Sequence, residues 1–399
     1  MAGIVASVSS ILAMARAVKR ETGRGYRQQM SDLRRLKRTN PTCGSTDYYW
    51  YQMWRQPPPA FGDFLGWRSQ QPLSLALNPR IGVTAAWDKL VFATLAQAHG
   101  IPTGALKGAF KPDGILPGFI PDRMRSIDEV RAFLGRDANF PVSAKPAHGQ
   151  QGFGGFFLVG RDGVGGLITK KGERIAFDDF IRRSIDFPKR DYYRREAGYL
   201  FQEVVEQHPE ITGFSGTEAP SGFRIVVLND DNGPVIHRAV WKLTLPGNSN
   251  DNFSLGKYGN LVADVEVATG AVAAAVNGLP PQCRFFTEHP ASGRAFRDFT
   301  IPMWDRVCEA VLEASSAFSL MRILHWDVVL TAEGPVFLEL NDLGGTEILQ
   351  VNGMPLVDHR LKDFLHRWGT LEPYPELKAL VGGEEARQIT SAQGASAPP

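Results

Sequence analysis

The segment HWDVVLTAEGPVFLELN, residues 325–341, sets two carboxylates and an amide into an apolar hairpin. Glu339 and Asn341 lie two residues apart in a predicted strand, so both side chains point to one face. Antiparallel pairing across the turn brings Asp327 opposite Leu338 or Glu339, close enough for the three polar side chains to converge. Their hard oxygen atoms suit Mg²⁺, whereas zinc sites favour nitrogen and sulfur. A half-exposed strand with solvated charges is the alternative, but carboxylates within such apolar runs favour a divalent metal site at Asp327, Glu339 and Asn341.

A glycine-rich loop follows a lysine in FPVSAKPAHGQQGFGGFFLVG, residues 140–160. A P-loop places its glycines before the lysine, and a Rossmann turn opens a helix. Here Lys145 precedes the glycines, and the apolar GGFFLV that comes next is typical of a strand. The order predicts a strand, a loop and a second strand, in which backbone N–H groups of the loop fold over a triphosphate. An ordinary exposed hairpin turn is the competing interpretation of this loop taken alone.

Composition places the chain among globular proteins with more than one domain. Its 399 residues are 43% hydrophobic, and Lys+Arg 44 against Asp+Glu 42 leave a formal charge of +2, which gives no reason to expect a nucleic acid as partner. Three cysteines without a CxxC motif argue against a disulfide framework and a zinc site. We therefore expect a reducing, cytoplasmic location.

Basic charge is concentrated in residues 1–46, where the apolar start MAGIVASVSSILAMARAV predicts a helix. The start lacks a basic region before its apolar part and is too short to span a bilayer, which argues against a signal peptide and a transmembrane segment. A solvated helix packed on its own domain is the favoured interpretation. Peripheral contact of this basic helix with an anionic membrane or polymer is the alternative.

Helices and hairpins alternate in blocks along the rest of the chain. Helical spacing predicts one helix within residues 84–100, a second over 126–135 that is capped by Ser126, and a third over 303–318. Paired alternating runs with turns at DDNG, ATG and TAEG predict antiparallel hairpins. This arrangement predicts an α+β fold rather than a doubly wound parallel sheet.

Six motifs occur in a fixed order between about residues 87 and 356: WDK, FPVSAKP with GQQGFGG, FQEVVEQHPE, SGFRIVVL, DNFSLGKYGN, and HWDVVL with PVFLELN. Together they resemble the ATP-grasp superfamily, most closely the sugar-transfer-associated branch related to alpha-L-glutamate ligases. The resemblance implies two α+β subdomains that clamp ATP, preceded by an N-terminal helical extension. Ser221-Gly222 and Tyr258 depart from the pattern of the branch.

The resemblance also implies roles by position. Lys89 and Lys145 match two lysines that reach the ATP phosphates, and Arg224 would face the γ-phosphate or an acyl-phosphate oxygen. The predicted metal group matches the ligands of Mg²⁺ in this superfamily, often two ions, with Mn²⁺ as an alternative. The positions that match the closing loop and the adenine and ribose site are Gln150, Gln151, Gly152, Gly154, Gly155, Glu203, Val204, Val205, Glu206 and Glu210.

Two further polar positions lie on predicted strands. Lys242, with Arg238 four positions earlier on the same face, is a candidate for binding a substrate carboxylate or phosphate, and ordinary edge-strand charges are the alternative. His325 shares the strand face of Asp327, and a structural role is favoured for this histidine.

By this resemblance the protein is expected to be an ATP-dependent carboxylate–amine ligase that forms an acyl-phosphate intermediate. Small-molecule carboxylate and amine substrates in cell-surface glycan or natural-product biosynthesis are expected, as is a homodimer. A phosphotransferase acting on a small molecule, and a non-catalytic nucleotide-binding partner in polysaccharide assembly, are the alternatives. The predicted divisions are 1–75 for the basic extension, 76–135 for the first part of the ATP-grasp module, 136–210 for the ATP-binding lid, 211–372 for the catalytic subdomain and 373–399 for a tail.

Overall fold

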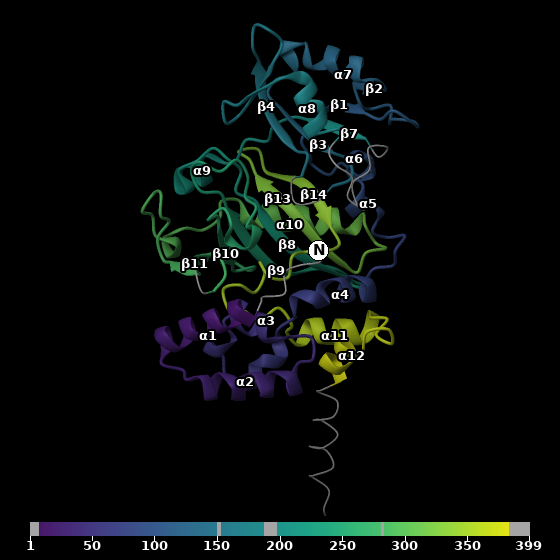
Figure 1. Cartoon of the computed structure of the whole chain (residues 1–399). Coiled ribbons are helices and arrows are strands. Elements are labelled where there is room, and N and C mark those ends of the chain that lie inside the picture. Colours follow the sequence, from purple (N-terminus) through teal and green to yellow (C-terminus); the bar gives the residue numbers. More distant parts are fainter. Residues whose placement is uncertain (1–7, 150–152, 187–197, 281–282, 383–399) are drawn as a thin grey trace, which may run out of the picture.

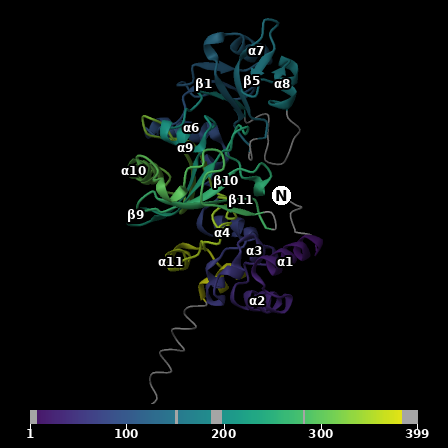
Figure 2. The same ribbon diagram turned by 90° about the vertical axis from the view of Figure 1, so that its left-hand side faces the viewer.

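The computed structural model describes residues 8–149, 153–186, 198–280 and 283–382 of the chain. Two seven-stranded sheets and a set of helices follow one another along the long axis of the molecule (Figure 1, Figure 2). The first sheet lies at one end, the second lies in the middle, and helices from both ends of the sequence form the other end. No described helix is both long and apolar enough to cross a membrane.

The first sheet has the strand order β2-β1-β7-β3-β4-β5-β6. Its strands are β1 (Leu106–Phe110), β2 (Asp122–Met124), β3 (Val142–Pro146), β4 (Phe156–Arg161), β5 (Leu167–Thr169), β6 (Arg174–Ile175) and β7 (Tyr199–Gln202). Its hydrophobic core includes α7 (Ile127–Leu134) and α8 (Phe177–Arg183). α7 begins as predicted after Ser126, whose hydroxyl accepts a hydrogen bond from the N–H of Glu129. The sequence predicts a division between residues 135 and 136. The sheet crosses this division, because β1 and β2 lie before it and β3 to β7 lie after it.

The second sheet is antiparallel in the order β12-β11-β10-β9-β8-β13-β14. Its strands are β8 (Phe223–Asp230), β9 (Gly233–Leu243), β10 (Leu261–Val265), β11 (Val272–Asn277), β12 (Arg284–Phe286), β13 (Ile323–Leu330) and β14 (Pro335–Asn341). The predicted hairpins β8–β9, β10–β11 and β13–β14 are confirmed. Alternate residues of β8 enter different cores, because α10 (Trp304–Ser316) covers one face of the sheet and other helices cover the second.

The prediction of a single helix within residues 84–100 is wrong. The structure has two helices there, α5 (Thr84–Trp87) and α6 (Lys89–Ala98), separated at Asp88. The backbone of Asp88 is extended, and its carboxylate accepts hydrogen bonds from the N–H groups of Leu90 and Val91. An aspartate that caps a helix in this way starts a new one, so Lys89 is the first residue of α6.

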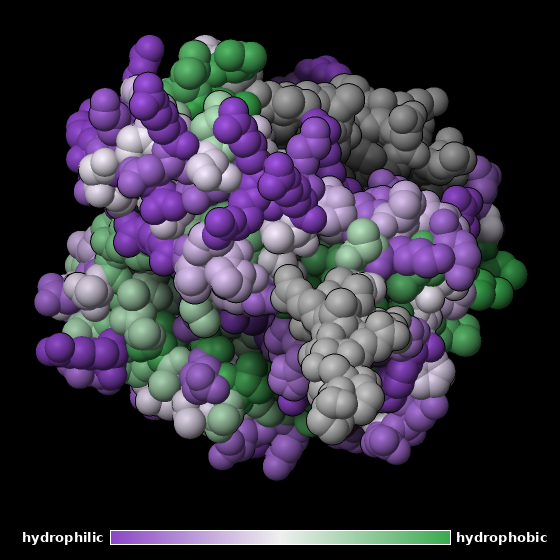
Figure 3. All heavy atoms as spheres, turned by 90° about the horizontal axis from the view of Figure 1, so that it is seen from below, coloured by the Kyte–Doolittle hydropathy of each residue, from purple (hydrophilic) through white to green (hydrophobic). Residues whose placement is uncertain are grey.

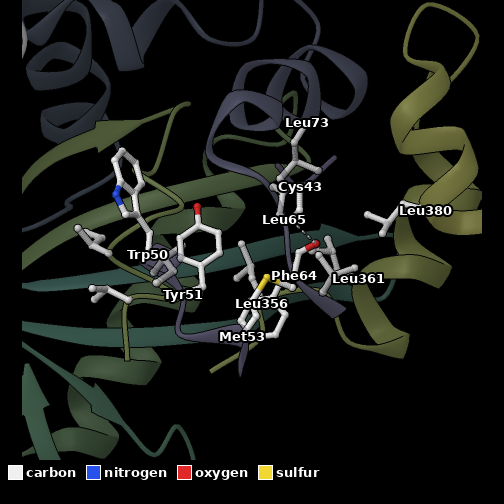
Figure 4. Close-up of a cluster of buried hydrophobic side chains, with 14 of the residues drawn as sticks. Cys43, Trp50, Tyr51, Met53, Phe64, Leu65, Leu73, Leu356, Leu361 and Leu380 are labelled. Carbon is white, nitrogen blue, oxygen red and sulfur yellow. Dashed lines mark hydrogen bonds between the residues drawn. The ribbon is translucent and has the colours of Figure 1, made fainter. Parts of the chain in front are cut away.

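Helices from the two ends of the described chain form what we call the helical base. These are α1 (Val8–Thr22), α2 (Tyr26–Thr39), α3 (Ser45–Trp50), α4 (Gln70–Leu77), α11 (His359–Trp368) and α12 (Pro375–Gly382). One hydrophobic core contains side chains from all of them and from the second sheet. Figure 4 shows part of this core, with Tyr51 and Phe64 near Leu356 and Leu361. The helical base therefore closes the face of the second sheet opposite α10.

Shorter helical segments connect these parts. They are α9 (Pro209–Ser215), which lies between the two sheets in sequence, and 3₁₀ turns at Met53–Arg55, Pro58–Asp63, Trp67–Ser69, Asp137–Asn139, Ser254–Gly256 and Phe296–Asp298.

Asn40 is fully buried in the helical base, and its side-chain amide donates to the carbonyl oxygens of Phe61 at 2.8 Å and Phe64 at 2.7 Å. We expect Asn40→Ala to lower the free energy of unfolding by about 2–4 kcal/mol, because both buried carbonyls lose their donor. Denaturant unfolding measures this change. Asn232→Ala, at an exposed turn position between β8 and β9, should change the same quantity by less than about 0.5 kcal/mol. Equal effects of the two variants would contradict this account of Asn40.

Candidate active site

Asp327 lies where strands β8, β13 and β14 pair side by side. In the sheet it is opposite Arg224 on β8 and Glu339 on β14. The Arg224 guanidinium donates two hydrogen bonds to the Asp327 carboxylate, from Nε to Oδ1 at 2.8 Å and from Nη2 to Oδ2 at 2.9 Å. The Lys242 ammonium on β9 contacts Oδ1 at 3.0 Å. One carboxylate therefore holds two cations on this face of the sheet.

The charges of this group keep one another ionised. Burial by itself would raise the pKa of the Asp327 carboxyl, but Arg224 and Lys242 outweigh burial and hold that pKa well below its usual range. Burial would lower the pKa values of Arg224 and Lys242, yet the neighbouring carboxylates raise both. The three side chains are therefore charged at neutral pH.

The structure brings the predicted metal group together. Asp327 is opposite Glu339 rather than Leu338, and the β13–β14 pairing shifts by one residue just beyond this point. The Asn341 amide lies between the two carboxylates, with Nδ2 3.4 Å from Asp327 Oδ2 and 3.4 Å from Glu339 Oε1. Two carboxylates and an amide oxygen are donors that fit Mg²⁺. Among the described residues, no three His, Cys, Asp or Glu side chains are arranged to hold a metal, so a site here depends on Asn341 as the third ligand.

Two lysines reach this group from elements that lie before the second sheet in sequence. Lys89 at the start of α6 has its Nζ 3.6 Å from Glu339 Oε2 and donates to the Gly149 carbonyl at 2.9 Å. Lys145 is on β3, where burial and the Lys89 ammonium lower its pKa to about 8 against the opposing effects of Glu339 and Asp327. The lysines of α6 and β3, together with the cations of the second sheet, thus act on one cluster of carboxylate oxygen atoms.

Two further polar contacts hold the start of α6 against the segment that follows β3. Asp88 Oδ2 lies 3.1 Å from His148 Nε2, and the N–H of Lys89 donates to the Ala147 carbonyl at 3.0 Å. Burial would raise the pKa of the Asp88 carboxyl, but the His148 hydrogen bond and the helix N–H groups lower it. This role of Asp88 was missed from the sequence, although an aspartate directly before the first residue of a helix is a recognisable cap.

Part of the predicted closing loop lies outside the described residues, namely Gln150, Gln151 and Gly152. Gly154 has φ +70°, which favours glycine, and its carbonyl accepts a hydrogen bond from the Tyr199 hydroxyl at 2.6 Å. Gly155 is exposed directly before β4. The predicted order of strand, loop and strand is confirmed, since β3 and β4 pair antiparallel.

The predicted adenine segment connects the two sheets. Glu203 directly follows β7, and its N–H donates to the Ala105 carbonyl at 2.8 Å. The segment continues through Val204, Val205 and Glu206 to α9, whose first turn holds Glu210. The Glu203 and Glu210 side chains are exposed, and neither forms an ion pair with another described residue. Among the described residues, no hydrogen bond or ion pair joins their carboxylates to the charged group around Asp327.

The loop after β14 supplies contacts that the sequence did not reveal. Arg224 Nη1 donates to the Gly344 carbonyl. A Cβ at Gly344 would lie 1.8 Å from Nδ1 of His325, so only glycine lets the loop lie on this ring. Burial and the nearby Arg224 lower the pKa of His325 to about 3, so the ring is neutral. This agrees with the structural role favoured for His325.

Asp251 is a further partner that was missed. Its Oδ2 lies 3.2 Å from Lys242 Nζ and accepts a hydrogen bond from the N–H of Gly222 at 3.1 Å. Arg238, predicted to act with Lys242, instead forms an ion pair with Asp264. Lys242 is therefore tied to the Asp327 group, and Arg238 has a separate partner.

A family model described as "Sugar-transfer associated ATP-grasp" matches residues 68–365. The chain belongs to this family. The expected α+β ATP-grasp fold is thereby confirmed, and the match covers both sheets and α4 to α10. A comparison with curated proteins gives no match.

Solved structures similar to this ATP-grasp protein share little of its sequence. The VanG D-Ala:D-Ser ligase from Enterococcus faecalis is 14% identical with a TM-score of 0.42, and the similarity covers 73% of this chain and 64% of the ligase, less than two thirds of its length. The D-alanine-D-alanine ligase from Coxiella burnetii is 11% identical with a TM-score of 0.38, covering 82% of this chain and 68% of its own.

We expect Lys145 to reduce the stability of the fold. Because its pKa is lowered to about 8, the folded chain binds this proton more weakly than the unfolded chain, so the penalty is complete below pH about 8 and fades as pH rises toward the pKa of the unfolded chain. Lys145→Met should raise the free energy of unfolding at pH 7 by about 1–2 kcal/mol, with a smaller gain near pH 10. Denaturant titrations at both pH values measure the gain, with Lys171→Met, at an exposed position in the turn between β5 and β6, as the control for removing a lysine from this sheet. A gain for Lys145→Met that does not change with pH would contradict the prediction.

Proposed function

We propose that this ATP-grasp protein is an ATP-dependent ligase that joins a carboxylate to an amine through an acyl-phosphate. The observation that carries the proposal is the approach of cations from two sides to the oxygen cluster at Asp327. These cations are Lys89, Lys145, Arg224 and Lys242. Phosphoryl transfer depends chiefly on positioning and on positive charge around the phosphate oxygens, which such a group can supply. Membership of the ATP-grasp family supports ATP as the phosphoryl donor.

The oxygen cluster would hold the divalent cation. Asp327, Glu339 and Asn341 would bind Mg²⁺, one or two ions, or Mn²⁺ in its place. The bound ion would supply positive charge against the phosphate oxygens. An ionised carboxylate has about four acceptor positions; in Asp327, Arg224 takes two and Lys242 one, so a metal ion would take the fourth, which the Asn341 amide nitrogen faces at 3.4 Å.

In the proposed reaction, a carboxylate oxygen of the first substrate attacks the γ-phosphorus of ATP, and the bond between that phosphorus and ADP breaks. The amine nitrogen of the second substrate then forms a C–N bond to the acyl carbon, phosphate leaves with its C–O bond, and the nitrogen loses a proton. Lys89 and Lys145 would bind phosphate oxygens of ATP. Arg224 and Lys242 would stabilise charge on the acyl-phosphate. No side chain of the protein needs to form a covalent bond.

The test is ADP release in the presence of Mg²⁺ with amino acids and uronic acids supplied in pairs. Uronic acids are included because the family description refers to sugar transfer. A ligase releases ADP in quantity only when both a carboxylate and an amine are present. Release with a hydroxyl acceptor alone would identify a phosphotransferase and overturn the proposal. Tight ATP binding without turnover of any pair would instead support a non-catalytic nucleotide-binding protein.

Glu339→Gln is expected to lower the rate of ADP release by about 10²-fold or more, because it removes a negative oxygen ligand while keeping the shape of the side chain. Lys145→Ala should have a comparable effect through loss of a phosphate contact. The matched control is Glu333→Gln, an exposed glutamate in the turn of the same β13–β14 hairpin, which should keep the wild-type rate. Unchanged ADP release in Glu339→Gln, with the fold intact by circular dichroism, would remove this residue from the site.

A further inference from the structure

The outer surface of α1 and α2 carries positive charge that the proposed function does not use, and we call it the α1–α2 surface. Its exposed cations are Arg16, Lys19, Arg20, Arg27, Arg34, Arg35, Lys37 and Arg38. Within the described residues, the ion pairs of these two helices are Arg24–Asp32 and Arg55–Glu21, which include none of these cations. The surface therefore presents positive charge that no described carboxylate neutralises.

Large hydrophobic side chains stand among these cations. Leu12 on α1 is 49% exposed, and Tyr26 and Met30 on α2 are 49% and 51% exposed. Helical spacing of four residues puts Leu12 beside Arg16 and Met30 beside Arg34. Exposed hydrophobic residues are common when scattered singly, but here they share the outer faces of two adjacent helices with the basic residues.

The inner sides of the two helices hold this surface in place. Met14 and Leu36 are buried in the helical base, and the Gln29 side chain donates to a backbone carbonyl of α1 at 3.1 Å. On the outer side, Lys19 Nζ lies 4.9 Å from the centroid of the Tyr26 ring. The exposed groups of both helices therefore form one surface that is built before any partner binds.

We propose that the α1–α2 surface binds an anionic membrane, with lipid headgroups against the cations and with Leu12, Tyr26 and Met30 entering the interface. Each cation near an anionic bilayer favours binding, and the apolar side chains gain a burial that a soluble polyanion does not offer. This end of the molecule lies opposite the first sheet (Figure 1), and Figure 3 shows it as largely hydrophilic with hydrophobic groups between. The bound protein would keep the first sheet turned away from the bilayer. This inference does not depend on the ligase activity.

Sedimentation of the full chain with lipid vesicles tests the proposal. We expect binding to phosphatidylcholine vesicles that contain about 30% phosphatidylglycerol, weak binding to phosphatidylcholine alone, and a steep loss of binding as salt is raised. Arg27→Glu combined with Arg34→Glu should weaken partitioning about 30-fold or more, since each lost cation accounts for about fivefold. Leu12→Ser combined with Met30→Ser should weaken it about tenfold at both low and high salt.

The matched control reverses two charges elsewhere, Arg123→Glu with Arg297→Glu, at exposed arginines of β2 and of the 3₁₀ turn before α10. It should partition as the wild type does, and thermal unfolding checks that every variant is folded. Wild-type partitioning of the Arg27 and Arg34 variant would overturn the proposal. Tighter binding to heparin than to vesicles, unaffected by the serine substitutions, would also overturn it, because the partner would then be a soluble polyanion.

Discussion

The ion pair between Asp327 and Arg224 fixes the geometry on which the rest of the site depends. Both side chains are almost entirely buried, and charges taken out of water are costly unless their hydrogen bonds are satisfied. Arg224 meets this condition with two bonds to the carboxylate and one to the loop after β14. The pair therefore aligns β8 with β13 and also holds the chain that leaves β14. Loss of Asp327 would leave the buried Arg224 without its ion-pair partner, whereas loss of Arg224 would leave Asp327 with Lys242 alone.

The two sides of the site differ in charge balance. On the second sheet, Arg224 and Lys242 are matched by Asp327 and Asp251. On the other side, Lys89 and Lys145 act on Glu339, so the positive charge there exceeds the negative charge. Such an excess of positive charge lowers the stability of the ligand-free protein and favours the binding of an anionic ligand. A destabilising arrangement of this kind is tolerated when a large core elsewhere supports the fold, and the core of the helical base is of that size.

Local sequence patterns, such as turns and helical spacing, predicted the helices and strands around the site better than the contacts between their side chains. The turn at TAEG restricted the β13–β14 pairing to within one residue, which was enough to bring Asp327 and Glu339 together. Asp251 and Gly344 were not predicted, because their contacts with Lys242 and Arg224 join distant positions and depend on packing that leaves no periodic pattern. The break between α5 and α6 was missed because the apolar residues on both sides of it keep helical spacing, while a single cap determines where α6 begins.

Hydrophobic residues from both ends of the described chain share the core of the helical base. This core therefore cannot close around α1 and α2 until α11 and α12 have been synthesised. The first helices leave the ribosome early, but the side chains of α11 and α12 that complete their core leave more than 300 residues later than α1. Contacts that close this core span most of the sequence, as in the hydrogen bond from Gln52 Nε2 to the Val351 carbonyl at 3.1 Å. Such non-local contacts form slowly. Until they form, the second sheet exposes an apolar face, the kind of surface on which a nascent chain aggregates or recruits a chaperone.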